Sequence, residues 1–172
     1  MEICPATANQ AGDLGYVQAM SWRAAYADII PKHVLSQFTP DARSRAFSAA
    51  CLTQPPYHYL GYVEGSPAAF LAVGPSRDVD SAPHTAEVAA LYLLPDYWGH
   101  GYGRELMDFA VNLCRTCHCT AITLWVLEKN SRAIHFYTHY GFVFDGRARL
   151  ITLGVPLDER RLRLKLVNVA GK

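Results

Sequence analysis

One stretch of the chain, residues 85–117, constrains the fold more than any other. An apolar run from Val88 to Leu94 predicts a buried strand, Pro95 ends it, and a turn with glycine at alternate positions opens directly into a helix (Gly99, Gly101, Gly103). Glycine lets the backbone take positive φ values and approach a ligand closely, and the first N–H groups of a helix have no partner within it. Because these groups lie at the positive end of the helix dipole, the stretch predicts an anion-binding site, suited to a phosphate.

The helix after the glycine turn decides how the cysteines are interpreted. Apolar residues recur along it every three or four positions, as one stripe of an amphipathic helix: Leu106, Phe109, Ala110, Leu113, Cys114 and Cys117. The same region contains C-x-x-C-H, typical of a haem attachment site or half of a zinc site. Packing is the favoured interpretation, since free cysteine is among the most buried residue types. We therefore expect Cys114 and Cys117 in the core and no bound metal.

Composition narrows the class of partner. With 172 residues the chain is long enough for a single domain with its own core, and we expect one domain over residues 1–172. A net charge of +1 gives no basic excess for nucleic acid or an anionic membrane, which favours a small-molecule partner. No apolar run reaches the roughly 20 residues of a membrane span, and the N-terminus lacks the pattern of a signal peptide. A cytoplasmic location is the default expectation.

The remaining segments predict a mixed α/β fold. The expected strands are residues 3–6, 57–64, 67–73, 120–127, 142–153 and 157–167, and the expected helices lie near residues 13–26, 31–38, 39–52 and 131–140. Residues 74–84 are polar and rich in turn formers, which indicates a mobile loop. The strand at 120–127 should lie beside the strand at 88–94, because strand, helix and strand in succession imply a parallel crossover.

Two common phosphate-binding loops do not match the glycine turn. A P-loop needs Lys and Ser or Thr after its last glycine, whereas Gly103 is followed by Arg104 and Glu105. A dinucleotide fingerprint needs G-x-G-x-x-G, and these glycines alternate. A turn shaped by glycines without any ligand remains an alternative. A second pattern downstream argues against it: Asn130, Ala133, Ile134 and Tyr137 share one face of a short helix.

Together, LYLLPDYWGHGYGRELM and LWVLEKNSRAIHFYTHYGF closely resemble the paired cofactor-binding motifs of the GCN5-related N-acetyltransferases, the GNAT superfamily. The family pattern Q/R-x-x-G-x-G/A falls on Trp98 to Gly103, with Trp98 in place of Gln or Arg. The resemblance implies a mixed sheet of about six to seven strands with helices on both faces and central strands splayed at the cofactor site. It also implies acetyl-CoA as the acyl donor.

Site residues follow from the resemblance, position by position. The backbone of Leu91, Tyr92 and Leu93 would pair with pantetheine like an added strand. The pyrophosphate would lie on Trp98, Gly99, His100, Gly101, Tyr102, Gly103 and Arg104. Asn130 would bind the pantetheine arm beside Ala133, and Tyr137 stands where the family has its general acid.

An amine acceptor arrives protonated at neutral pH, with a pKa of about 10.4, so attack needs a base or a chain of waters. Glu87 is the best-placed carboxylate, with an exposed charge at a strand edge as the alternative account, and Glu128 is a second choice. An N–H near Leu93 would stabilise the oxyanion.

The resemblance implies a primary amine of a small molecule or of a protein as the acceptor. The aromatic side chains that could surround it are Trp22, Tyr26, Tyr92 and Trp125, and Asp28 could pair with its ammonium. Each has a simpler account, core packing for the aromatics and a solvated helix end for Asp28. Two rival functions stay open, a non-catalytic sensor of acyl-CoA on the same fold and a zinc or haem protein. The oligomeric state, monomer or homodimer, is open as well.

Overall fold

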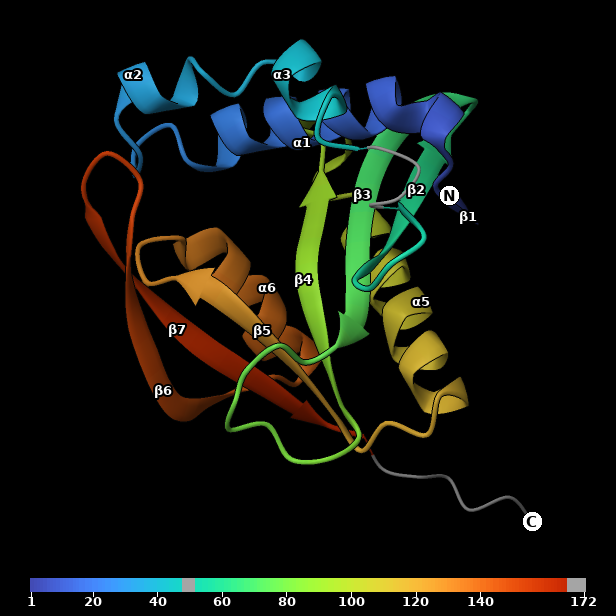
Figure 1. Ribbon diagram of the computed structural model, residues 1–172, viewed down its shortest axis with the longest axis vertical. Coiled ribbons are helices and arrows are strands. Elements are labelled where there is room, and N and C mark those ends of the chain that lie inside the picture. The colour runs from blue at the N-terminus through green and yellow to red at the C-terminus, as the bar shows by residue number, and fades with distance from the viewer. Residues whose placement is uncertain (48–51, 167–172) are drawn as a thin grey trace.

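A computed structural model describes residues 1–47 and 52–166 of the chain. Its centre is a seven-stranded sheet in the order β1-β2-β3-β4-β5-β7-β6 (Figure 1). The strands are β1 (Glu2–Pro5), β2 (Tyr57–Val63), β3 (Ser66–Pro75), β4 (Thr85–Leu93), β5 (Ala121–Leu127), β6 (Val143–Thr152) and β7 (Pro156–Lys165). The helices are α1 (Ala11–Ala25), α2 (Lys32–Leu35), α3 (Pro40–Ser44), α5 (Tyr102–Thr116) and α6 (Ser131–Tyr140), with short 3-10 turns η1 (Ala8–Gln10) and η2 (Pro95–Tyr97).

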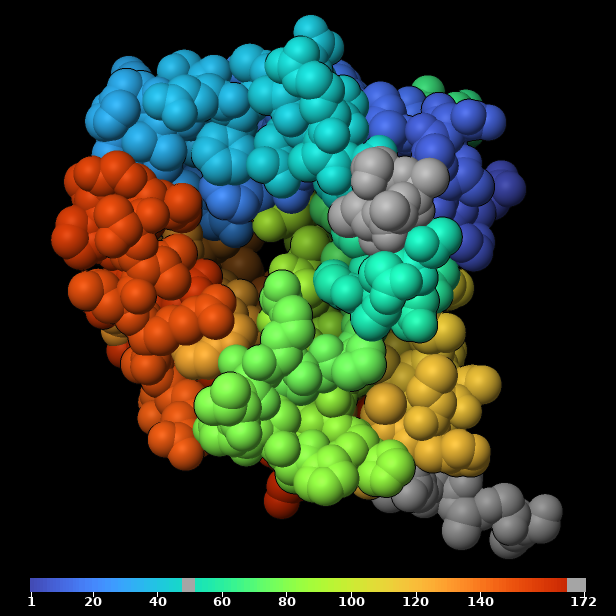
Figure 2. Space-filling view, in the orientation of Figure 1, coloured from blue at the N-terminus to red at the C-terminus, as the bar shows by residue number. Residues whose placement is uncertain are grey.

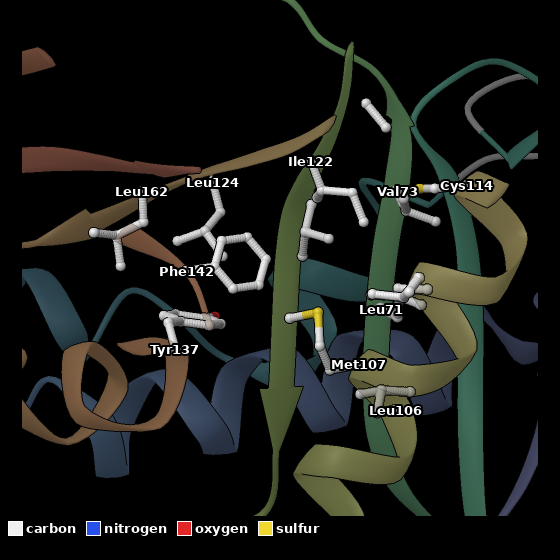
Figure 3. Packing of buried hydrophobic residues seen from close by; sticks show 14 of the residues in the cluster. Leu71, Val73, Leu106, Met107, Cys114, Ile122, Leu124, Tyr137, Phe142 and Leu162 are labelled. Carbon is white, nitrogen blue, oxygen red and sulfur yellow. The ribbon is translucent and has the colours of Figure 1, made fainter. Parts of the chain in front are cut away.

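Helices cover both faces of the sheet, and each layer has its own hydrophobic cluster. On one face α1 packs Leu14 and Val17 against Leu60 and Phe70 of β2 and β3. On the other face α5 and α6 pack against β3, β4, β5 and β7 around Met107, Leu124 and Phe142 (Figure 3). The mixed α/β fold with helices on both faces is therefore confirmed.

The parallel pairing of β4 with β5 is also confirmed, but it is short. Only Thr85–Glu87 of β4 pairs with β5, opposite Ala121–Thr123. On its other side β4 stays paired with β3 as far as Leu93, with a register shift that leaves Ala89 as an extra residue. Such a bulge bends the strand that carries it. Beyond Glu87 the two strands diverge (Figure 1), and this is the splay that the resemblance implied.

A glycine in α1 allows the first helices to pack closely. A Cβ placed on Gly15 would lie 2.4 Å from the backbone nitrogen of Ser44 in α3. The Thr39 side chain caps α3 by accepting from the Ala42 N–H at 3.2 Å. The helix expected over residues 39–52 is shorter than predicted, since α3 ends at Ser44, and residues 48–51 of that prediction lie outside the described part of the chain.

One of the two cysteines expected in the core is not there. Cys114 is buried, and burial raises the pKa of its thiol to about 12. Cys117 is exposed because α5 ends one residue earlier, so the last member of the predicted stripe lies beyond the helix. Within residues 1–47 and 52–166, no group of His, Cys, Asp and Glu has the arrangement of a metal site. The same described residues contain no helix long and apolar enough to cross a membrane.

The segment expected to be a mobile loop, residues 74–84, is held to the sheet by ion pairs. Gly74 and Pro75 belong to β3. From β7, the buried Arg161 donates to Asp78 at 3.0 Å and to Asp80 at 2.7 Å. A further bond joins Arg161 to Asp145 of β6 at 2.8 Å. The prediction missed this because Arg161 is about 80 residues away from the loop in the chain, and local signals do not report such contacts.

Replacement of Arg161 tests how much this network stabilises the fold. Arg161→Ala leaves partly buried carboxylates without their partner, so we expect a loss of about 3 kcal/mol in the free energy of unfolding. Arg147→Ala is the matched control. Its side chain is 62% exposed and also bonds Asp80, so its removal should cost about 0.5 kcal/mol. Urea unfolding followed by circular dichroism measures both, and equal losses would contradict the assignment.

Candidate active site

The gap between β4 and β5 continues into a cleft of about 580 Å³. The cleft brings together most of the residues that the resemblance assigned to the cofactor: Leu91, Tyr92, Leu93, Trp98, Gly99, Gly101, Gly103, Arg104, Asn130, Ala133 and Tyr137. Two of the predicted residues, His100 and Tyr102, do not line it. His100 is exposed, which agrees with a glycine turn that uses its backbone rather than its side chains.

The open edge of β4 presents backbone groups to this cleft. The N–H of Leu94 donates to Ala68 of β3 at 2.9 Å. Because successive amides in a strand point to opposite sides, the N–H groups of Leu91 and Leu93 face the gap instead. No described strand pairs with them there. The edge is thus free to bind an extended ligand.

The glycine turn has the conformation that the sequence predicted. Gly99 and Gly101 have φ values of 80° and 86°, in the left-handed region, and Gly101 is the N-cap of α5. A Cβ on either residue would meet nothing within 4 Å, so packing does not explain the glycines at these positions. The backbone conformation does. The start of α5 consequently lies at the cleft, where its unpaired N–H groups favour an anion.

Trp98, which replaces the Gln or Arg of the family pattern, has two partners. Its indole N–H donates to the Leu93 carbonyl at 2.8 Å. The guanidinium of Arg132 lies over its ring, 4.2 Å from the centroid. Arg132 lines the cleft beside Arg104. Sequence reasoning missed Arg132, since nothing in the sequence showed that a residue of α6 would stack on Trp98.

Tyr137 is held in the cleft by the capping of α6. The Asn130 side chain accepts from the Ala133 N–H at 3.2 Å, and Gly141 ends the helix in a left-handed conformation, as expected. Tyr137 is 8% exposed and packs its ring against Phe142 (Figure 3). Burial, with a smaller contribution from Tyr92, raises the pKa of Tyr137 above its usual value. The hydroxyl is therefore protonated at neutral pH, and the raised pKa makes it a weaker acid than an exposed tyrosine.

A second cavity, of about 110 Å³, adjoins the cleft. Figure 2 shows a hollow between the N-terminal helices, β4 and the β6–β7 hairpin, the elements that supply its lining. Several residues line both spaces: Tyr26, Ala89, Tyr92, Trp125, Leu127 and Glu159. The predicted acceptor residues Trp22, Tyr26 and Trp125 all line this cavity. Asp28 is exposed and lines neither space.

The candidate base Glu87 lines the second cavity but is already bonded. Its Oε1 accepts from Arg77 Nη2 at 2.6 Å, and its Oε2 accepts from Arg77 Nε at 2.9 Å and from the Arg77 backbone N–H at 3.1 Å. The second choice, Glu128, is exposed and forms an ion pair with Arg160. Glu159 is the carboxylate that sequence reasoning missed, and it lines both the cleft and the cavity.

Comparison with known proteins agrees with this geometry. The sequence model of the acetyltransferase (GNAT) family matches residues 21–142, and the chain therefore belongs to this family. It is 32% identical to an uncharacterized N-acetyltransferase of Mycobacterium bovis over 152 residues, 85% of this chain and 90% of that protein. It is 36% identical to the peptidyl-lysine N-acetyltransferase YjaB of Salmonella typhimurium over 67 residues, 39% of this chain and 43% of that protein.

Among solved structures, the PaiA N-acetyltransferase of Thermoplasma acidophilum in complex with coenzyme A superposes with a TM-score of 0.73 at 18% identity. The match covers 96% of this chain and 98% of that one, and at this identity it shows a shared fold.

Asn130 offers a test of how its side chain stabilises the start of α6. Asn130→Ala removes the cap, so we expect the free energy of unfolding to fall by about 1 kcal/mol. Asn130→Ser keeps a capping oxygen, so its free energy of unfolding should fall by only a few tenths of a kcal/mol. Chemical denaturation of both variants measures the difference. Equal stability of the two variants would show that the Asn130 side chain does not cap α6.

Proposed function

We propose that the protein transfers the acetyl group of acetyl-CoA directly to a primary amine of a small molecule or protein. The observation that carries the proposal is the meeting of the cleft and the second cavity at the gap between β4 and β5. A donor in one space and an acceptor in the other would touch there. Membership of the acetyltransferase family and a structural neighbour described in complex with coenzyme A support acetyl-CoA as the donor.

The residues of the cleft fit this donor. The free N–H of Leu91 suits a pantetheine arm with its own amide groups, running along β4 like a strand. The start of α5 after Gly101 suits the pyrophosphate, and Arg104 and Arg132 add positive charge beside it. Arg132 thereby supplies the cation that Trp98 does not. Acetyl-CoA supplies the acetyl group as a thioester when it is bound.

Tyr137 is the proposed general acid. Its buried, protonated hydroxyl lies in the cleft and would donate to the departing thiolate. The N–H of Leu93 faces the gap and would bind the oxygen that becomes negative during attack. The amine must lose a proton, and the second cavity offers two carboxylates for this purpose, the predicted Glu87 and the additional Glu159.

Tyr137→Phe is the central test. We expect kcat to fall roughly 10²–10⁴-fold, because general acids typically contribute this much, while affinity for acetyl-CoA stays near that of the wild type. Release of CoA with a panel of amines measures the rate, and mass spectrometry identifies the acetylated product. Equal rates for wild type and variant would remove Tyr137 from the mechanism. Acetyl-CoA binding with no product from any amine would favour a non-catalytic sensor.

Arg132→Ala tests the replacement of the missing family side chain. Loss of a charge beside the phosphates should weaken CoA binding about tenfold, and binding of pantetheine, which has no phosphate, should not change. The control is Arg115→Ala, an exposed arginine in the last turn of α5 that does not line the cleft. Titration calorimetry with both ligands measures the affinities. A similar loss for pantetheine would mean that Arg132 acts through the fold rather than through its charge.

A further inference from the structure

Two carboxylates line the second cavity, and they differ in what already binds them. Both oxygens of Glu87 accept from Arg77, which leaves little capacity for a substrate. Glu159 bonds Arg149 through Oε2 alone, at 2.7 Å. Its Oε1 has no hydrogen-bond partner among residues 1–47 and 52–166. Glu159 is therefore the carboxylate whose second oxygen is available to bind a substrate.

Glu159 also lies where the two spaces meet. It is on β7 opposite Leu127, the last residue of β5, where the gap between β4 and β5 is widest. It lines both spaces, whereas Glu87 lines only the second cavity. Burial raises the pKa of Tyr26 and Tyr92, and the charge of Glu159 adds a smaller contribution to each. Glu159, Tyr26 and Tyr92 all line both spaces, so the carboxylate shares the junction with the two phenols.

The rest of the cavity selects the group that would bind Glu159. Four aromatic residues line the second cavity: Trp22, Tyr26, Tyr92 and Trp125. An ammonium is attracted both by a carboxylate and by aromatic faces. No lysine or arginine is present among the described residues that line the cavity. Arg77 and Arg149 are not among the lining residues and are already bonded to Glu87 and Glu159. A carboxylate on the acceptor would therefore lose its water and find no unpaired cation in the cavity, which costs affinity.

The volume of the second cavity limits the size of the group that carries the amine. An apolar cavity of about 150 Å³ holds a benzene ring. The second cavity, with about 110 Å³, suits a thinner group such as a short unbranched alkyl chain. Ala89, Leu127, Ile151 and Leu153 give such a chain apolar surface.

We infer that the acceptor is a primary amine on a short alkyl chain with no carboxylate beside the nitrogen, and that Glu159 binds its ammonium. This inference rests on the proposed acetyl transfer. A free alkylamine and a lysine side chain of a peptide both present this chemistry. An α-amino group of a free amino acid does not, because its carboxylate would enter the cavity with it.

Glu159 then also receives the proton in the transfer. The ammonium gives one proton to the Glu159 carboxylate, and the neutral nitrogen forms the bond to the acetyl carbon. The carbon–sulfur bond breaks, and the thiolate takes the Tyr137 proton. The second nitrogen proton leaves to solvent as the amide forms, the Glu159 proton follows it, and solvent reprotonates Tyr137, so one acetylated amine, one CoA thiol and one released proton result.

A matched pair of acceptors tests the inference. Pentylamine and L-norleucine differ only by the carboxylate beside the nitrogen. We expect wild-type kcat/KM to be at least about tenfold higher for pentylamine, as expected for the burial of one carboxylate without a cation. Nα-acetyl-lysine amide, tested in parallel, distinguishes a peptide source from a free amine. A preference for norleucine, or equal rates, would overturn the inference while leaving acetyl transfer established.

Glu159→Gln tests the residue. The amide oxygen of the substituted side chain can still accept from Arg149, so the fold should persist, while kcat/KM for pentylamine should fall about 10- to 100-fold. The preference for pentylamine over norleucine should shrink, which a purely structural role would not cause. Asp158→Asn is the control, an exposed neighbour on β7 with the same change of charge.

An unchanged preference in Glu159→Gln would overturn the role of Glu159. Loss of the preference in Glu87→Gln alone would assign the ammonium to Glu87 and overturn that role as well. If the wild type acetylates none of the three amines and no other amine of the panel, the proposed function fails and the inference with it. Acetylation only of amines outside this class overturns the inference alone.

Discussion

The early end of pairing between β4 and β5 is the feature on which the site depends. Two strands in the middle of a sheet normally satisfy each other's amides along their length, because buried backbone groups are costly to leave unpaired. Here the pairing with β5 stops at Glu87, and the extra residue Ala89 bends β4 away, while β3 stays paired with β4 on both sides of the bulge. The gap that results supplies free amides, a cleft and a passage between the two faces.

The helices and loops around the gap keep it open in a defined shape. The start of α5 and the capped start of α6 lie on its two sides and bring Gly101 and Asn130 to the same cleft. Across the sheet, the buried Arg161 joins the loop at residues 76–84 to β7. The same loop carries Arg77, so the stability of the fold and the bonding state of Glu87 depend on one segment.

Local signals in the sequence predict the elements that form the proposed cofactor side of the site. Each of these elements is determined by residues that are neighbours in the chain, so the sequence predicts it directly. They are the strand, the alternating glycines, the Asn130 cap and the final Gly141. The acceptor side depends on partners that are distant in the chain. Nothing near Glu159 indicates that β7 pairs with β5 and places it at the gap, and nothing near Arg77 indicates that it bonds Glu87. The prediction that Cys117 is buried was wrong for a local reason, because α5 ends one residue before the last position of the apolar stripe.

In the proposed function, the residues common to the cleft and the second cavity would make the binding of donor and acceptor interdependent. Tyr26, Tyr92, Trp125 and Glu159 line both spaces, so a ligand in either one restricts the same side chains. Ordering a side chain on binding costs about 0.5–1.5 kcal/mol, and the first ligand bears that cost for the second. The resulting cooperativity would be reciprocal: whatever factor the donor added to the affinity of the acceptor, the acceptor would add to the affinity of the donor.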